Sequence, residues 1–364
     1  MDSSIARRQQ RHAEPELERG TAQRIIEILT PLTPDQLHTE VGGTGVIATY
    51  DSGVDGPVLM FRSELDDVAI EQRGGGDRTA MLMGLAERLA AERPPSGKVH
   101  LLVQPPADIG PSVGAVLADP AFDQIAPDAV VGIRCVPGHP MHAVVVKPGP
   151  MFAAVRSFII RYVGSTAHAA EPDTGENPSL AIADLLHECD ELTRPDPASP
   201  DFAVATAVQV IIGSPAYDVS AGAGELHLSI RAVDDERLEA LFETIVSKAE
   251  RFAQRDLLSV SAEIVENLSA TINDPHVADL ASAAALDCGL DVTVPDAGSP
   301  HGNTFGLFSA QFPCCMVLLG AGVGPAAADH PDDDVSDEFL AIGNDLIASG
   351  VELLHRIVRN GDRR

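Results

Sequence analysis

Two histidines three residues apart, His139 and His142, have the residue type and the spacing to bind one metal ion. Neutral imidazoles are common zinc ligands, and short ligand spacings occur in zinc sites. Their segment, GHPMH, is rich in turn residues, so an accidental spacing within a loop is the alternative interpretation. His301, in GSPHGNTF, is a second candidate for acid–base chemistry, either as a general base or as a loop histidine with a structural hydrogen bond.

Two common catalytic signatures are missing from the sequence. It contains no G-x-S-x-G serine motif and no phosphate-binding loop.

Its five cysteines, an odd number without a C-x-x-C pair, indicate reduced and mostly buried thiols. The N-terminus has no apolar signal core, and no run approaches the roughly 18 apolar residues of a membrane span. We therefore expect a cytoplasmic protein.

The charge of the chain argues against two classes of partner. Its 364 residues carry a formal net charge of −29, which should repel nucleic acids and anionic membranes. A hydrophobic fraction of 45% is typical of globular proteins, and the length suits one or two domains. The partner we expect is a small molecule, with neither nucleic acid nor membrane involved.

Hydrophobic periodicity predicts alternating helices and strands along most of the chain. Residues 16–30 and 79–93 have the spacing of amphipathic helices. Residues 46–49 and 58–61 flank a Gly/Asp turn and predict a hairpin. The alternation is typical of an α/β fold with a largely parallel sheet. The other elements predicted for this part are strands at 98–104, 129–134, 291–294 and 314–319, and helices at 274–287 and 337–358.

The pattern changes between residues 154 and 267 to that of an α+β unit, which indicates a separate inserted domain. We therefore predict a larger mixed-sheet α/β domain at 1–153 plus 268–364, and a smaller α+β domain at 154–267. The elements predicted for the insertion are a strand at 155–164, helices at 178–193 and 235–254, and strands at 203–212 and 225–231.

Seven short motifs follow one another along nearly the whole chain: H-x-x-P-E-L at 12–17, GTGV at 43–46, RSELDDVAIE at 62–71, TAMLMGLA at 79–86, VHLLVQPPAD at 99–108, the run 149–172 that contains STAHAAEP, and DHPDDD at 329–334. In this order they resemble the amidohydrolase branch of the M20 metallopeptidases. The resemblance implies a catalytic-type α/β domain with an inserted lid and dimerisation domain. The activity that it implies is cleavage of linear amide bonds in N-acyl amino acids or peptides. A homodimer through the inserted domain is also implied.

The resemblance also implies a two-metal site, in which the metals lower the pKa of a bridging water and polarise the carbonyl. Its ligands and base come from C-G-H, a Glu-Glu pair, L-H-x-x-P and a final histidine. The matching positions here are Arg73-Gly74-Gly75, Ala107-Asp108, Arg134 and His330. Four of the five ligand positions have changed. Asp108 is the one replacement that could still bind a metal ion, and His330 is the one ligand that is unchanged, so these two are the metal-binding remnants.

The replacements at these positions carry positive charge. Arg73, Arg134 and Arg78 bring guanidinium groups to the place where the resemblance implies two metal ions. Guanidinium groups can neutralise nearby acids or bind a carboxylate, and drift in an unused pocket is the alternative. The acids expected in the same region are Glu64, Asp66 and Asp108, of which Asp66 and Asp108 are the candidate catalytic residues.

Three further residues match substrate-contacting positions of the family. His168, in STAHAAEP, corresponds to a histidine that helps polarise the scissile carbonyl, often across a dimer; a packed loop residue is the alternative. Arg231 and Asp218 fall near a substrate-binding arginine and the asparagine of N-V-I-P, a motif altered here to Asp218-Val219-Ser220-Ala221.

Three functions remain open. The first is a metal-free pseudoenzyme, or one with altered metal-independent chemistry, that binds an N-acyl amino acid or peptide-like carboxylate; it needs no cofactor. The second is an active amide hydrolase with a rebuilt zinc or manganese site. Its ligands would be His330, Asp108 and Asp66, with one of His139, His142 or His301. The third is a structural or regulatory partner of an active paralogue.

Overall fold

The computed structural model describes residues 15–65, 77–105, 111–136, 138–322 and 337–361. Its chain divides into two compact units. Unit 1 contains residues 1–149, 272–295 and 307–364, and unit 2 contains residues 150–271 and 296–306. Unit 2 therefore interrupts unit 1 in the sequence, and each unit has its own hydrophobic core.

Unit 1 is built on an eight-stranded mixed sheet of order β1-β2-β4-β3-β5-β14-β6-β13. β3, β4, β5 and β14 are parallel neighbours, and β2 runs antiparallel to β4. The four parallel strands are apolar over most of their length, as expected for strands buried on both faces. The strands are β1 (Gln36–Val41), β2 (Gly45–Asp51), β3 (Val58–Glu64), β4 (Lys98–Gln104), β5 (Ala129–Val136), β6 (Val144–Val145), β13 (Val292–Thr293) and β14 (Cys314–Gly320).

The hairpin predicted for residues 46–49 and 58–61 is wrong. Both segments are strands, but β4 lies between β2 and β3, pairing antiparallel with the first and parallel with the second. The Gly/Asp-rich connection is longer than the two-residue turn that couples adjacent hairpin strands. It therefore carries the chain past the place that β4 later occupies.

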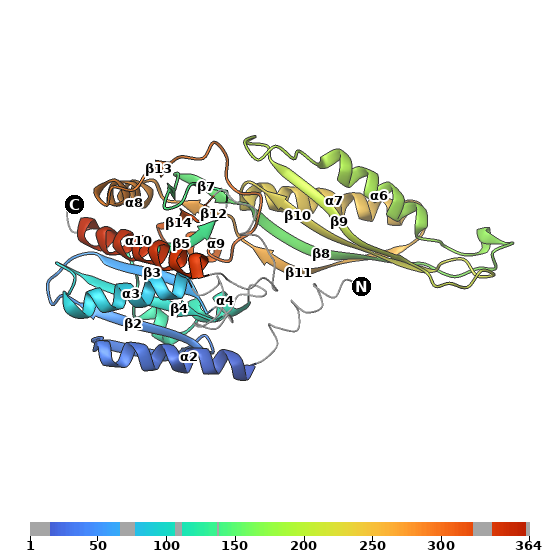
Figure 1. Ribbon diagram of the computed structural model, residues 1–364. Coiled ribbons are helices and arrows are strands. Elements are labelled where there is room, and N and C mark those ends of the chain that lie inside the picture. Colours follow the sequence, from blue (N-terminus) through green and yellow to red (C-terminus); the bar gives the residue numbers. More distant parts are fainter. Residues whose placement is uncertain (1–14, 66–76, 106–110, 137, 323–336, 362–364) are drawn as a thin grey trace. The chain divides into compact units, whose positions relative to one another are not determined.

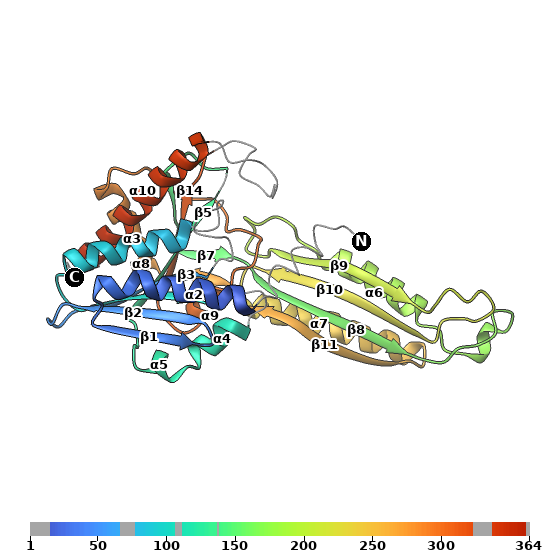
Figure 2. The same cartoon turned by 60° about the horizontal axis from the view of Figure 1, so that its bottom comes forward.

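Helices cover both faces of this sheet (Figures 1 and 2). The larger core joins one face to α2, α3, α8 and α10. On the other face, Phe122 of α5 packs 6.1 Å from Phe308 of α9, measured between ring centroids. The unit 1 helices are α2 (Pro15–Leu29), α3 (Asp77–Ala91), α4 (Pro111–Leu117), α5 (Pro120–Asp123), α8 (Pro275–Asp287), α9 (Gly306–Ser309, which begins at the last residue of unit 2) and α10 (Asp337–Gly361), with the 3₁₀ turn η1 (Thr30–Leu32).

Unit 2 is a four-stranded antiparallel sheet of order β11-β8-β10-β9, with α6 and α7 packed on one face (Figure 1). β10 shows why: buried and half-buried residues alternate along it, so every second side chain enters the core. Its elements are β8 (Ala154–Val163), η2 (Pro172–Thr174), α6 (Ser179–Leu192), β9 (Ala203–Ile212), β10 (Ala223–Ala232), α7 (Asp235–Arg255) and β11 (Ser259–Leu268); β7 (Gly149–Phe152) and β12 (Thr271–Asn273) lie where the sequence passes from one unit to the other.

Among the described residues, no helix is both long enough and apolar enough to cross a membrane.

Candidate active site

The carboxyl ends of β3, β4, β5 and β14 meet at one edge of the unit 1 sheet, because the four strands run parallel. Ligand sites of open α/β sheets lie at such an edge. Glu64 pairs with Gln104 at the end of β3 and β4. Gly132 pairs with Arg62, so Arg134, two residues further along β5, falls in the row of Glu64 and on the same face.

Arg62 is the centre of a polar network at this edge. Its Nε donates to Oε1 of Gln104 at 2.8 Å, and its Nη2 donates to Oε1 of Glu64 at 2.8 Å. Arg78, from the start of α3, reaches the other carboxylate oxygen of Glu64 at 3.4 Å. Arg62 is only 3% exposed, and its guanidinium carbon lies 5.8 Å from the ring centre of Phe308. A charge so deeply buried is tolerated because it is paired and hydrogen-bonded.

Only the amide oxygen of Gln104 takes part in this network. Its side chain is fully buried, and Arg62 uses its oxygen. The amide nitrogen Nε2 is also buried and has no hydrogen-bond partner. Buried donors without an acceptor are uncommon, and each points to a water, ion or strained contact.

The sequence did not single out Arg62 and Gln104 as site residues. The available signal was a charged or amide side chain inside otherwise apolar strands, VLMFRSE and KVHLLVQ. Arg134, Glu64 and Arg78, which it did single out, lie at the carboxyl edge of the sheet. The positions of Asp66, Arg73, Asp108 and His330 lie outside the described residues.

One of the five positions at which the resemblance places a metal ligand lies within the described residues. Arg134 stands at the end of β5 where the resemblance places a histidine ligand, and a guanidinium cannot bind a cation. No group of three or more His, Cys, Asp or Glu side chains in the described ranges could hold an ion. His139 forms a backbone bridge with Gly322. His142 has a positive φ of 66° and its Nδ1 bonds to Oγ of Ser349 at 2.9 Å.

His168 and Asp218 lie together at one end of unit 2. Their two loops pair there: His168 forms a bridge with Val219, and the amide of Ala169 donates to the carbonyl of Asp218 at 2.9 Å. Nδ1 of His168 accepts from the amide of Ala170 at 3.1 Å. In the neutral ring the proton is therefore on Nε2, which can donate to a ligand.

Arg231 lies at the opposite end of the same sheet. It is one residue from the end of β10, and the loop with Asp218 precedes the start of that strand. Ten residues of β-strand span about 30 Å, so one copy of unit 2 does not bring Arg231 and Asp218 together. Arg231 donates from Nη1 to the carbonyl of Pro300 at 3.1 Å, next to the exposed His301.

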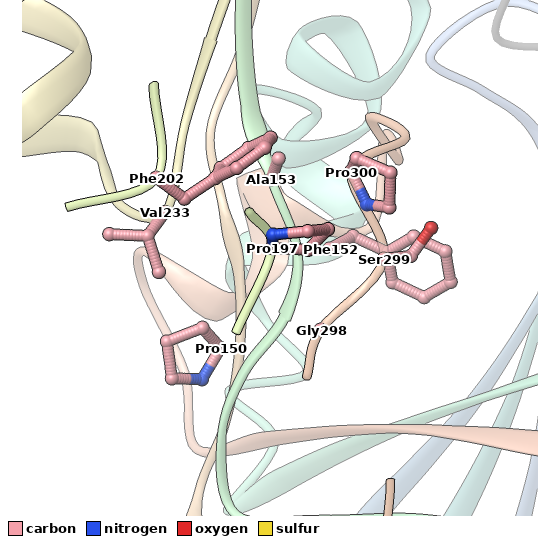
Figure 3. Close-up of a pocket in the computed structure, with 9 residues that line it drawn as sticks. All are labelled: Pro150, Phe152, Ala153, Pro197, Phe202, Val233, Gly298, Ser299 and Pro300. Atoms are coloured by element: carbon pink, nitrogen blue, oxygen red, sulfur yellow. The ribbon is translucent and has the colours of Figure 1, made fainter. Parts of the chain in front are cut away.

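A pocket of unit 2 lies beside this bond (Figure 3). Phe152, Phe202 and three prolines form most of its wall, and Ser299 supplies the one hydroxyl group. None of its lining side chains can carry charge or transfer a proton at neutral pH. Its chemistry suits an apolar group, and it offers nothing for hydrolysis.

Comparison with known proteins gives a consistent result. The model of peptidase family M20/M25/M40 matches residues 58–359. An N-acetylcysteine deacetylase of Bacillus subtilis is 26% identical over 94% of this chain and 94% of its own. An N-acetyldiaminopimelate deacetylase of Shouchella clausii is 24% identical over 88% of this chain and 90% of its own.

Solved structures show the same fold. A dinuclear metal-binding M20 peptidase of Bacillus subtilis superposes with a TM-score of 0.73 at 22% identity, over 93% of this chain and 92% of its own. A protein of methicillin-resistant Staphylococcus aureus gives a TM-score of 0.78 at 21% identity, over 92% and 91%. The predicted α/β architecture is confirmed by these likenesses.

Proposed function

Because the chain belongs to peptidase family M20/M25/M40, we propose that it uses the family fold to bind an N-acyl amino acid or a peptide-like carboxylate without metal ions. The observation that carries this proposal is Arg134, which lies in the row of Glu64 at the carboxyl edge of the sheet. The resemblance places a histidine ligand at that position. A fixed cation there favours an anionic ligand and opposes a metal ion.

The charges around Arg134 support the same ligand class. Arg62 and Arg78 both bond to Glu64, so three guanidinium groups and one carboxylate are described at this edge. Arginine binds carboxylates in a two-point geometry that lysine does not match. A ligand with a carboxylate therefore suits the chemistry of these side chains.

Hydrolysis is not part of this proposal. The resemblance places the general base at Ala107, whose side chain cannot accept a proton. The protein would then act as a binding protein, or carry out chemistry that needs neither metal nor that base. The names of its relatives indicate the ligands to test first, N-acetylcysteine and N-acetyldiaminopimelate.

The first experiment is elemental analysis of full-length protein purified without chelator, then soaked in zinc, manganese or cobalt. We expect no metal above background. One or two ions per chain that disappear in His330→Ala would overturn the proposal in favour of a hydrolase with a rebuilt site.

The second experiment is calorimetric titration with N-acetylcysteine and with its neutral carboxamide analogue. We expect the acid alone to bind, and Arg134→Met to weaken binding by at least tenfold, because the pairing cation is lost. Arg88→Met is the matched control, since Arg88 is half-exposed and pairs with Glu352 on α10. Equal binding of the acid and the carboxamide would refute the role of the carboxylate.

A further inference from the structure

The amide group of Gln104 has a fixed orientation. Its Oε1 accepts from Nε of Arg62 at 2.8 Å. A guanidinium only donates hydrogen bonds, so the oxygen of the amide, and not its nitrogen, must face Arg62. The amide nitrogen Nε2 therefore points away from Arg62. Exchanging the two atoms would place one donor against another.

This nitrogen is a donor that lacks an acceptor. Nε2 of Gln104 is closed off from solvent and has no hydrogen-bond partner among the described residues. Leaving a buried donor unpaired is costly. If the side chain had only to accept from Arg62, a glutamate would do so through a charge-assisted bond and would leave no donor unpaired. The amide thus supplies a group that the described fold does not use.

Gln104 also lies at the edge of the sheet where ligands of such folds bind. It is the last residue of β4, and it pairs with Glu64, the last residue of β3. Four other buried side-chain atoms in the described part of the chain lack a partner, and none is at the carboxyl end of a parallel strand. Gln104 is therefore the one of the five that is placed to meet a ligand. The other four atoms belong to Tyr50, His100, Thr271 and Asn360.

Gln104 and Arg134 stand on either side of Glu64 in one row of the sheet. β3 lies between β4 and β5, and the three residues share one face. Two strand spacings, roughly 10 Å, separate the backbones of Gln104 and Arg134. Side chains of this length can contact two acceptors of one small ligand, a carboxylate and a neutral carbonyl a few bonds away.

We infer that Nε2 of Gln104 donates to the acyl carbonyl oxygen of the ligand whose carboxylate pairs with Arg134. The inference rests on the function proposed above and adds a second contact to it. An N-acyl amino acid carries both acceptors, whereas a free amino acid has a charged ammonium group and no acyl oxygen. Gln104 would therefore select acylated over free amino acids. A hydrogen bond shielded from water is stronger than one at the surface, which strengthens the selection.

The test compares the binding of levulinate and pentanoate by calorimetry. The two acids share one carbon chain and one carboxylate, and they differ only in a keto oxygen, which lies where N-acetylglycine has its acyl oxygen. The keto group is better hydrated, so without a donor levulinate should bind more weakly than pentanoate. We expect the wild type to bind levulinate roughly tenfold more tightly, because the buried donor gains its acceptor.

Gln104→Glu removes the donor and keeps an acceptor for Arg62. Its added charge weakens the binding of both acids, so the ratio of the two affinities isolates the contact to the keto oxygen. We expect the preference for levulinate to disappear or reverse. Tyr50→Phe is the matched control, because it removes another buried unpaired atom, from the interior of β2, and should keep the wild-type ratio.

The outcomes separate this inference from carboxylate binding itself. Equal or weaker binding of levulinate by the wild type, or an unchanged ratio in Gln104→Glu, overturns the inference and leaves carboxylate binding intact. Binding of neither acid overturns both. A crystal structure of the wild type with levulinate needs no variant to fold. A keto oxygen within hydrogen-bond distance of Nε2 would support the inference, and a water that stays on Nε2 beside the bound acid would overturn it.

Discussion

The guanidinium of Arg62 donates from Nε to Oε1 of Gln104 at 2.8 Å, joining two buried side chains from neighbouring parallel strands. The same guanidinium binds Glu64. One residue therefore holds together the polar ends of β3 and β4 at the edge where a ligand would bind. In such a buried network, the hydrogen bonds of one guanidinium support several partners at once.

Replacing Arg62 should be far more costly than replacing Arg78. Arg62→Met leaves the buried amide oxygen of Gln104 without its donor and takes the shorter of two arginine contacts from the partly buried carboxylate of Glu64. This should lower the free energy of unfolding by about 3–5 kcal/mol. Arg78 is 23% exposed and its contact with Glu64 is longer, so Arg78→Met should cost less than about 1 kcal/mol. Urea denaturation monitored by circular dichroism measures both, and equal losses would contradict the assigned role of Arg62.

His100 should make the protein less stable in mild acid. Burial lowers the pKa of His100 from 6.5 to about 4, and its Nδ1 bonds to Oγ1 of Thr49 at 2.8 Å. The unfolded chain therefore binds a proton that the folded chain excludes between these two pH values. Stability is complete above pH 6.5 and falls as pH drops toward 4, by roughly 3 kcal/mol in total.

The measurement for His100 is urea denaturation at several pH values from 7.5 to 4.5. His100→Gln should remove this part of the pH dependence and leave the contribution of the carboxylates. An unchanged slope in the variant would show that His100 titrates normally in the folded protein.

Two buried tyrosines offer a matched pair of variants. The hydroxyl of Tyr50 has no hydrogen-bond partner, and burial raises the pKa of Tyr50 to about 12. The hydroxyl of Tyr162 donates to the carbonyl of Ala249 at 3.2 Å. Tyr50→Phe should be neutral or stabilising, and Tyr162→Phe should cost about 1 kcal/mol, because only the second loses a hydrogen bond. Thermal unfolding measures the stability of both variants. A larger loss for Tyr50→Phe than for Tyr162→Phe would contradict the hydrogen bonding described for the two hydroxyl groups.

Two glycine-to-alanine variants distinguish the cost of a left-handed backbone conformation from the cost of steric crowding. Gly97 and Gly53 have φ values of 64° and 73°, in the left-handed region that favours glycine. A Cβ at Gly97 would lie 1.9 Å from the carbonyl oxygen of Pro57, whereas a Cβ at Gly53 would meet nothing within 4 Å. Gly53→Ala should cost about 1 kcal/mol and Gly97→Ala clearly more, as measured by urea denaturation. Similar losses would mean that the turn at Gly97 moves aside.

The regular elements were largely predictable because their patterns are strong. The helix predicted at 79–93 corresponds to α3 at Asp77–Ala91, and the strand predicted at 98–104 has the bounds of β4. Strand order was not predictable in the same way. A periodic pattern shows that a segment is a strand but not which strand lies beside it, and so β4 was not expected between β2 and β3. β11 was missed because its glutamates and serines obscure the alternation.

The candidate site was predictable only where a motif pointed to it. Arg134 was named from its motif and lies in the row of Glu64. Arg62 and Gln104 were missed, because a pattern of apolar residues does not reveal which polar groups bond inside it. The placement of His168 and Arg231 at opposite ends of one sheet follows from strand direction, which no local motif contains.

Because unit 2 interrupts unit 1 in the sequence, unit 2 is nearly complete during translation before the last segment of unit 1 is made. Residues 150–271 form nearly all of unit 2, so it can fold on the ribosome while the end of unit 1 is still being made. β14 (Cys314–Gly320), the strand between β5 and β6, is translated after that. Until it arrives, β5 is an exposed apolar edge. During biosynthesis the larger unit, rather than the inserted one, is therefore the part of the nascent protein that most needs a chaperone.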